Sequence, residues 1–283
     1  NYTNLKNKLG RIPQLRDFDD YGEMDVIRIF DNKSLGSYYK FLVKYEKEYK
    51  LRLSDFDCYG RLSPAGVLGI FQDISGDHAE RLGIGYDAMF EHGLFWVILR
   101  AKYRFERPAE FYGGVKAQTV LHRPGRVFSL RDCRLYSESG DIIARGTTQW
   151  AVIHTDTRRL APMSGVLQEI SQENDEKPPE FPDGIKKLED FVTTDEPHIV
   201  CPGFSFLDRN GHINNTCYAA MIADAVKPQR DEIIEGFQID FLHEVMADEK
   251  LFIYTVRENG IIRIKALSAD GEIKFRATLD IRR

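Results

Sequence analysis

One short segment of this chain carries side chains that could transfer an acyl group to water. It runs from Leu207 to Asn215 and places a carboxylate, an amide and an imidazole at alternating positions, in Asp208, Asn210 and His212. In an extended backbone, residues two apart share a face, so these three side chains are predicted to lie together. An amide and an imidazole can hydrogen-bond a carbonyl oxygen or its oxyanion, and a carboxylate can orient or activate a nucleophile.

The segment after this motif is predicted to be a helix, which would add to the same chemistry. Asn214 or Asn215 can cap it, and the free backbone N–H groups of a first helical turn attract developing negative charge. A simpler alternative is that the motif is an ordinary Asx turn in front of a helix. If the motif stood alone, this simpler interpretation would be favoured.

An earlier segment favours the active-site interpretation over the Asx turn, because it repeats the frame of the motif without its reactive side chains. Asp57 lies 151 residues before Asp208, and Gly60 has the same offset from its counterpart. Tyr59 and Arg61, however, stand where the amide and the imidazole would be. A retained frame with exchanged side chains indicates two related units, of which only the second has a working site.

A second pair of similar segments supports two tandem copies of one fold. Residues 137–147 resemble residues 268–278 at an offset of 131, in the same chain order as the first pair. A length of 283 residues also agrees with about two domains. We predict an N-terminal extension of unclear role, a first domain, an inter-domain linker rich in proline and acids, and a second domain, over residues 1–38, 39–161, 162–197 and 198–283.

Each unit is predicted to contain one long apolar helix and a run of strands, which favours an α+β fold. Ser63 and Pro64 are typical of the start of a helix, and Pro228 is expected to end the second one. Alternating apolar residues predict antiparallel strands at 39–56, 95–98, 101–105, 115–121, 127–136, 142–153, 198–206, 236–242, 251–256, 261–267 and 272–281.

Composition excludes several classes of protein. A net charge of −5 argues against a nucleic-acid partner, and no apolar run approaches the ~18 residues of a membrane span. The four cysteines show no C-x-x-C spacing, so neither structural zinc nor a disulfide framework is expected. Reduced thiols and the lack of a signal-peptide pattern predict a cytoplasmic protein.

The second motif resembles the signature of the acyl-acyl carrier protein thioesterases, double-hotdog enzymes of plants and bacteria that end fatty-acid synthesis. That signature is an Asp-x-Asn-x-His-x-Asn-Asn run followed by an acidic residue on a later strand. The chain shows it as Asp208, Asn210, His212, Asn214, Asn215 and, on the later strand, Glu244. The resemblance extends from about Tyr39 to the end of the chain.

The resemblance implies tandem hotdog domains, each a long apolar helix wrapped by an antiparallel sheet. It implies hydrolysis of fatty acyl-acyl carrier protein to free fatty acid and acyl carrier protein, with no metal or organic cofactor. Asn210 and His212 would polarise the thioester carbonyl, Asp208 would organise them or assist attack, and Glu244 would position or deprotonate water. The acyl chain would lie in the first unit. The expected substrate contacts are Asn214, Asn215, Val67, Leu68, Phe71 and Trp96.

Two alternatives to this function remain open. The carrier could be coenzyme A, or the protein could be a non-catalytic acyl-binding regulator on the same fold. The oligomeric state is also open, and a homodimer is possible. A cysteine nucleophile is not expected, because plant members usually carry cysteine just after the glutamate, where this chain has Val245. The nearest cysteine, Cys217, falls on the predicted helix.

Other titratable residues receive simpler interpretations. His78 is expected to be solvated or at a helix end, and Glu106, which aligns with Glu244, is expected to be structural. Clusters of basic residues at 102–107, 123–134 and 158–159 could steer an acidic carrier protein if they converge near the site.

Overall fold

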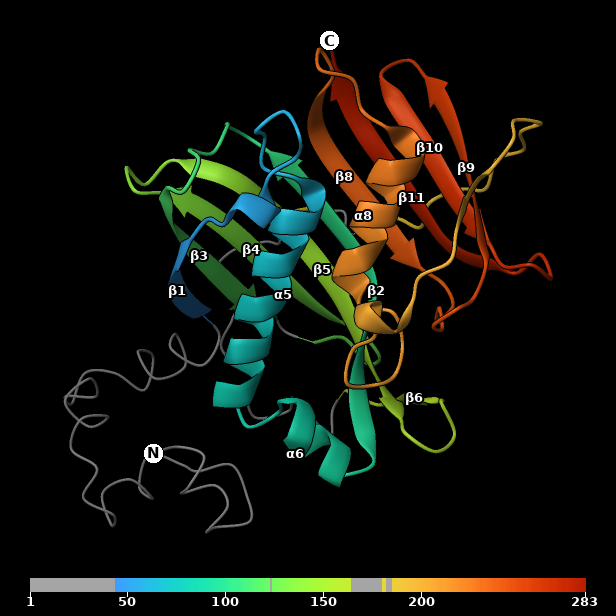
Figure 1. The fold of residues 1–283 in the computed structure, drawn as a ribbon. Coiled ribbons are helices and arrows are strands. Elements are labelled where there is room, and N and C mark those ends of the chain that lie inside the picture. The colour runs from blue at the N-terminus through green and yellow to red at the C-terminus, as the bar shows by residue number, and fades with distance from the viewer. Residues whose placement is uncertain (1–43, 123, 164–179, 182–184) are drawn as a thin grey trace, which may run out of the picture.

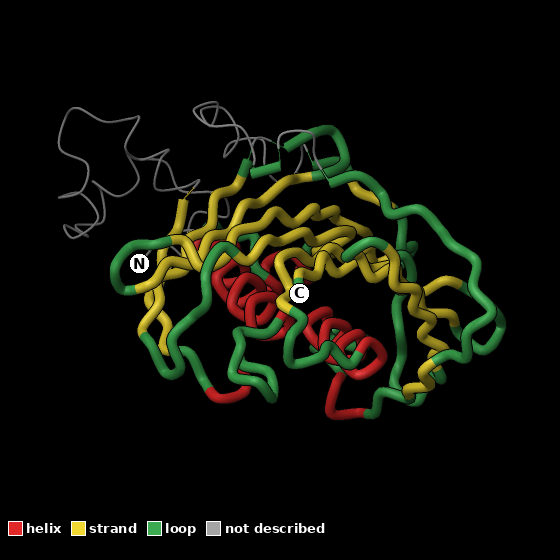
Figure 2. Tube along the Cα trace, turned by 90° about the horizontal axis from the view of Figure 1, so that it is seen from above, coloured by secondary structure: helices red, strands yellow, loops and turns green. Residues whose placement is uncertain are grey.

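Two helices and the sheet around them form the body of the protein. The computed structural model describes residues 44–122, 124–163, 180–181 and 185–283. Helices α5 (Pro64–Arg81) and α8 (Asn215–Val226) pack against each other on the concave face of one antiparallel sheet (Figures 1 and 2). The view from above shows the sheet arching over both helices. This arrangement confirms the predicted α+β fold.

The sheet is continuous across the two halves of the chain. Its order within the described residues is β1-β3-β4-β5-β2-β8-β11-β10-β9-β7, and β6 pairs with β5. Strands β2 and β8 join the halves, with Tyr103 opposite Phe237. The strands are β1 (Lys44–Lys50), β2 (Leu94–Phe105), β3 (Gly114–Leu121), β4 (Ser129–Ser137), β5 (Ile142–His154), β6 (Leu160–Ala161), β7 (His198–Val200), β8 (Ile233–Phe241), β9 (Leu251–Glu258), β10 (Ile261–Leu267) and β11 (Ile273–Arg282).

Both long helices begin where the sequence predicted. The Ser63 side chain accepts a hydrogen bond from the backbone N–H of Gly66, and proline occupies the first helical position. Asn214 caps α8 by accepting from Thr216 N–H, and α8 ends one residue before Lys227, which adopts a left-handed conformation. A shorter helix that the sequence did not indicate, α6 (Tyr86–Glu91), follows α5.

The predicted strands differ from the structure in three places. Within the described part of the segment 39–56, β1 ends at Lys50 and a 3₁₀ turn, η1 (Leu53–Asp55), follows. The segment 198–206 was predicted as one strand, but β7 ends at Val200 and a 3₁₀ turn, η2 (Phe204–Phe206), follows. Pro202 and Gly203 lie between them, and both residue types disfavour a continuous strand. In contrast, the strands predicted at 95–98 and 101–105 form the single strand β2, with a register shift between Ile98 and Arg100.

Residues 186–191 of the predicted linker cross the outer face of the second half of the sheet. The backbone N–H of Leu188 donates to the buried Asp240, and the Gln238 side chain donates to the carbonyl of Lys186. Residues 1–38, and residues 164–179 and 182–184 of the linker, lie outside the described residues, so the domain boundaries stay a prediction. None of the described helices is long and apolar enough to cross a membrane.

Candidate active site

The motif at 208–212 folds as a tight turn, so the prediction of an extended backbone was wrong. The Oδ1 atom of Asp208 accepts hydrogen bonds from the backbone N–H groups of Asn210, at 2.8 Å, and His212, at 3.4 Å. The backbone N–H of Asp208 donates to the His212 carbonyl, and Gly211 between them has φ +78°. The Asx-turn alternative therefore describes the backbone correctly.

The first unit contains the same turn. Oδ1 of Asp57 accepts from the backbone N–H groups of Tyr59 and Arg61, each at 2.9 Å, and Gly60 has φ +76°. Glycine tolerates this positive φ without the steric cost of a side chain. The two residues that the copies share, Asp and Gly, are thus the ones that build the turn. The exchanged residues are not needed for the backbone, which leaves the amide and imidazole of the second copy for another purpose.

Three side chains from different parts of the chain meet beside the second turn. Nε2 of His212 lies 3.1 Å from one carboxylate oxygen of Glu244, and Nη1 of Arg158 lies 3.1 Å from the other. The His212 side chain is 12% exposed and that of Glu244 is 44% exposed, so the carboxylate is open to water on one side. No group of three or more metal-ligating side chains occurs among the described residues.

Arg158 is a site residue that sequence reasoning missed. It lies in the hairpin turn between β5 and β6 with φ +55°, and its guanidinium also stacks over the Phe95 ring at 5.0 Å. The sequence placed it only in a cluster of bases. Its distance from Glu244 along the chain, 86 positions, explains why no local pattern could pair them.

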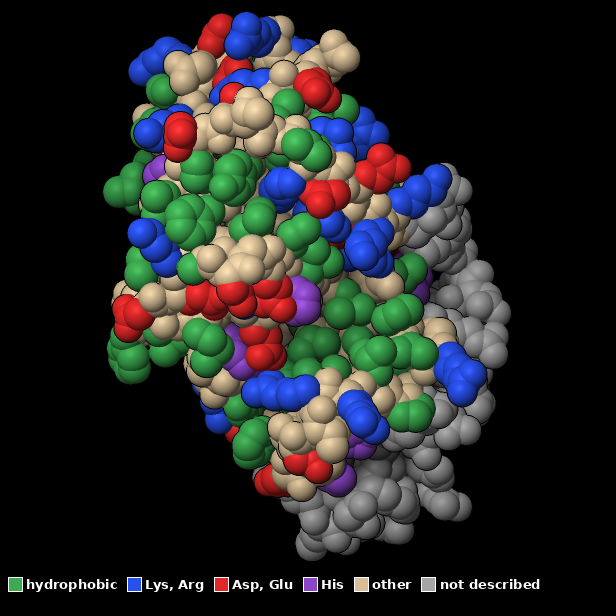
Figure 3. Space-filling model, turned by 90° about the vertical axis from the view of Figure 1, so that its right-hand side faces the viewer, with side chains coloured by type: hydrophobic (Ala, Val, Ile, Leu, Met, Phe, Trp, Pro, Cys, Tyr) green, Lys and Arg blue, Asp and Glu red, His purple; other side chains and the backbone are tan. Residues whose placement is uncertain are grey.

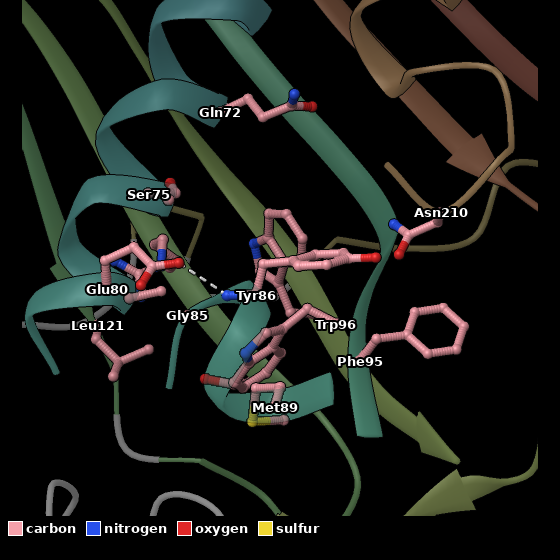
Figure 4. Close-up of a pocket in the computed structure, with 15 residues that line it drawn as sticks. Gln72, Ser75, Glu80, Gly85, Tyr86, Met89, Phe95, Trp96, Leu121 and Asn210 are labelled. Atoms are coloured by element: carbon pink, nitrogen blue, oxygen red, sulfur yellow. Dashed lines mark hydrogen bonds between the residues drawn. The ribbon is translucent and has the colours of Figure 1, made fainter. Parts of the chain in front are cut away.

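Asn210 stands where two pockets meet. One, of about 190 Å³, is lined by the catalytic candidates His212 and Glu244. The other, of about 230 Å³, is mostly apolar and runs beside α5 and α6 (Figure 4). Asn210, Phe95 and Trp96 line both. Among the described residues, the Nδ2 of Asn210 has only a long contact of 3.4 Å to Asp208, so this amide is available to a ligand.

Of the substrate contacts expected in the first unit, one lines the pockets and three lie in the hydrophobic core. Trp96 lines both pockets, and its Nε1 donates to the Ile84 carbonyl at 2.9 Å. Val67, Leu68 and Phe71 are buried in the hydrophobic core and line neither pocket. An acyl-binding role for these three stays a prediction.

The two asparagines after the motif also differ in position. Asn215 lines the polar pocket. The Asn214 side chain is occupied instead: its Oδ1 accepts from Thr216 N–H and from the side chain of Gln72 on α5, at 3.2 Å. Asn214 therefore ties the two helices together, and the N–H group that it caps is not free to bind a ligand.

Helix α6 holds the outer side of the turn at 208–212. The Tyr86 hydroxyl donates to the Arg209 carbonyl at 3.2 Å, and the Arg209 guanidinium stacks over the Tyr86 ring and pairs with Asp87 at 2.7 Å. This contact joins the wall of the apolar pocket to the turn that carries Asn210.

Comparison with known proteins shows which family the first half of the chain resembles. A family model described as the acyl-ACP thioesterase N-terminal domain matches residues 42–173. A second model, described only as a domain of unknown function, matches residues 1–57. Residues 42–173 therefore resemble the N-terminal domain of the acyl-ACP thioesterases. The predicted resemblance to this family is thereby confirmed.

Individual relatives agree with this assignment at low sequence identity. The chain is 24% identical to an oleoyl-acyl carrier protein thioesterase of Coriandrum sativum over 76% of its own length. It is 26% identical to a dodecanoyl-acyl carrier protein hydrolase of Umbellularia californica over 69% of its length. The matched segments span 63% and 54% of those relatives.

Two solved structures share the fold of this chain. An acyl-ACP thioesterase from Bacteroides thetaiotaomicron superposes with a TM-score of 0.73 at 20% identity, covering 84% of this chain and 98% of that one. The 12:0-ACP thioesterase from Umbellularia californica gives 0.74 at 23% identity, covering 84% and 97%. The predicted tandem hotdog architecture is confirmed.

Proposed function

We propose that this protein hydrolyses fatty acyl-acyl carrier protein to a free fatty acid and acyl carrier protein. The observation that carries the proposal is the position of Asn210, at the junction of an apolar pocket and a pocket holding His212 and Glu244. A thioester placed at this junction would have its chain on the apolar side and its carbonyl beside the polar groups. The names of the carrier-protein thioesterases that the chain resembles support the same reaction.

The geometry supports Glu244 as the group that activates water. Its carboxylate is held by His212 and Arg158 and is partly open to solvent. Glu244 takes a proton from water, the oxygen attacks the thioester carbon and the C–S bond breaks. Glu244 then returns the proton to the departing sulfur, so the carrier leaves as its thiol. Asn210 stabilises the developing oxyanion. Because Oδ1 of Asp208 already accepts two backbone N–H groups, we assign Asp208 to organising the turn.

Release of carrier thiol tests the proposal directly. Acyl carrier protein loaded with medium and long chains should release thiol rapidly with wild-type protein, and matched acyl-coenzyme A should be a poorer substrate. A folded wild-type protein that retains bound acyl chain but releases no thiol from either carrier would contradict the enzyme and favour an acyl-binding regulator. Faster thiol release from acyl-coenzyme A would contradict only the proposed choice of carrier and not the hydrolysis.

The surface charge gives the choice of carrier little support. Figure 3, which shows the side on which β9 lies, has one patch of acidic and histidine side chains with basic ones scattered around it. Some of the bases expected to steer the carrier are also unavailable. Arg131 is buried, and Arg134 is paired with Glu180. The carrier is therefore proposed from the relatives.

A cytoplasmic location is proposed on the state of the thiols. All four cysteines are free, and they are Cys58, Cys133, Cys201 and Cys217. Free thiols are typical of reducing compartments.

The oligomeric state is a separate question, and the homodimer stays a prediction.

Removing Arg158 should impair the reaction without unfolding the protein. Arg158→Gly deletes the cation but keeps the positive φ that this turn requires. We expect kcat/KM to fall about tenfold, since one charge-assisted hydrogen bond that fixes Glu244 is lost. Arg159→Gly, next to it in the same turn, is the control and should stay near wild type. Equal losses in both variants, measured by thiol release, would contradict a positioning role for Arg158.

Removing the nearest thiol should have little effect. Burial raises the pKa of Cys217 above its ordinary value, so the thiolate needed for nucleophilic attack is disfavoured. We expect Cys217→Ala to keep kcat within about twofold of wild type, because the proposed attack uses water. A complete loss of thiol release in a variant with unchanged thermal unfolding would restore the cysteine mechanism.

A further inference from the structure

One wall of the apolar pocket carries two polar side chains. Asn210 lies on one side of this pocket and Leu121 on another (Figure 4). Arg131 pairs in register with Leu121 across β3 and β4, and both line the pocket together with Ser129. The lining away from the turn at 208–212 therefore contains a guanidinium and a hydroxyl among apolar side chains.

Arg131 is buried without a carboxylate partner in the described part of the chain. It is 5% exposed, and Nη1 makes both of its hydrogen bonds, to Nδ1 of His78 at 2.8 Å and to the Thr119 hydroxyl at 3.2 Å. His78 was expected to be solvated or at a helix end; it lies in the last turn of α5, but it is 2% exposed because its ring faces this arginine. The Nε and Nη2 atoms of Arg131 have no hydrogen-bond partner among the described residues.

The two nearest candidates for a counter-charge are committed elsewhere. Asp132 points to the opposite face of β4, where it bonds His122 at 2.8 Å and the Thr147 hydroxyl at 2.5 Å. Glu80 lines the pocket, but its carboxylate accepts from the backbone N–H of Tyr86 at 2.9 Å and forms no ion pair with Arg131 within the described residues.

Ser129 adds a third unused donor on the same wall. It is 1% exposed, and its Oγ is buried with no hydrogen-bond partner among the described residues. Residues two apart on a strand share a face, so Ser129 and Arg131 point the same way, into the pocket that both line. A buried donor left without an acceptor is costly, and for a charged donor the cost is higher.

We propose that Arg131 and Ser129 form a subsite for an oxygen atom carried on the distal part of the acyl chain. The substrate class, which rests on the proposed thioesterase function, is an acyl chain whose far end bears a hydroxyl, oxo or carboxyl group. Such a group supplies the acceptor that these donors lack. A plain hydrocarbon of the same length would leave them unsatisfied.

The pocket volume sets the length of the probes. A cavity of about 150 Å³ accommodates benzene, so roughly nine or ten carbons fit in a pocket half as large again. The wild-type protein would be given acyl carrier protein loaded with decanoyl, ω-hydroxydecanoyl and the matching ω-carboxy chain. We expect kcat/KM for an oxygenated chain to exceed that for decanoyl by about 10- to 100-fold, the effect of one charge-assisted hydrogen bond.

Two variants assign the preference to this subsite. Arg131→Met should remove the preference, and Ser129→Ala should reduce it by about two- to tenfold, as for a neutral hydrogen bond. If Arg131→Met does not fold, Ser129→Ala alone carries the test. A wild-type protein that hydrolyses decanoyl at least as fast as both oxygenated chains would overturn the proposal.

A binding measurement separates this proposal from the proposed activity. Thermal unfolding of the wild type would be followed with methyl decanoate and with methyl ω-hydroxydecanoate, esters that have no carboxylate of their own to pair with Arg131. A larger stabilisation by the hydroxylated ester, reduced in Ser129→Ala, supports the subsite even if no carrier thioester is hydrolysed. Equal stabilisation by both esters contradicts the subsite whatever the activity.

Discussion

Replacing Glu244 with glutamine is expected to lower kcat by about 10²- to 10⁴-fold, the range for losing a general base. Glutamine keeps the size of the side chain but cannot take a proton from water. Its amide could still contact His212 and Arg158, which lie 3.1 Å from the two carboxylate oxygens. Single-turnover hydrolysis of a carrier-bound thioester measures the chemical step directly, and substrate binding should change little.

The first half of the chain offers a matched control for this variant. Glu106 was aligned with Glu244 in the sequence and expected to be structural, and in the structure it pairs with Arg145 at 2.8 Å. Glu106→Gln should keep kcat close to wild type, since an exposed ion pair contributes little. If both glutamine variants lost activity equally, or if Glu244→Gln stayed active, Glu244 would not be the base.

Replacing Asn210 with alanine is expected to lower kcat by about 10²- to 10³-fold, as for the removal of one oxyanion-hole donor. The backbone of the turn should survive, because Asp208 bonds to the main-chain N–H of Asn210 and the side chain contributes only a contact of 3.4 Å. Asn210→Asp keeps the shape but sets a negative charge against the oxyanion, so its loss should be at least as large.

Tyr59 supplies the control for Asn210. It occupies the equivalent position of the first turn, where Asp57 accepts from its backbone N–H in the same way. Tyr59→Ala should leave kcat near wild type, although its ring stacks with Arg61 at 4.7 Å and some stability will be lost. A fall in kcat for Tyr59→Ala equal to that for Asn210→Ala, at unchanged thermal unfolding, would contradict a single site in the second unit.

The helix starts were predictable because their signals are local. Ser63 and Pro64 specify a cap and a first turn within four residues, and the structure shows the expected bond to Gly66. Most strand positions were also predictable from alternation. The error at 198–206 arose because Pro202 and Gly203 stop a strand that the apolar pattern alone would continue.

The sequence by itself determined which residue types could react and which of the two motif copies carries them. It could not determine the backbone conformation that presents them. The pattern predicts an extended segment, but Gly211 and the hydrogen bonds to Asp208 fold it into a turn. Only the tertiary structure decided that Arg158 holds Glu244, that Asn210 joins two pockets, and that the buried Arg131 lines one of them. These contacts link residues far apart in the chain, and long-range packing has no local signature from which sequence patterns could predict it.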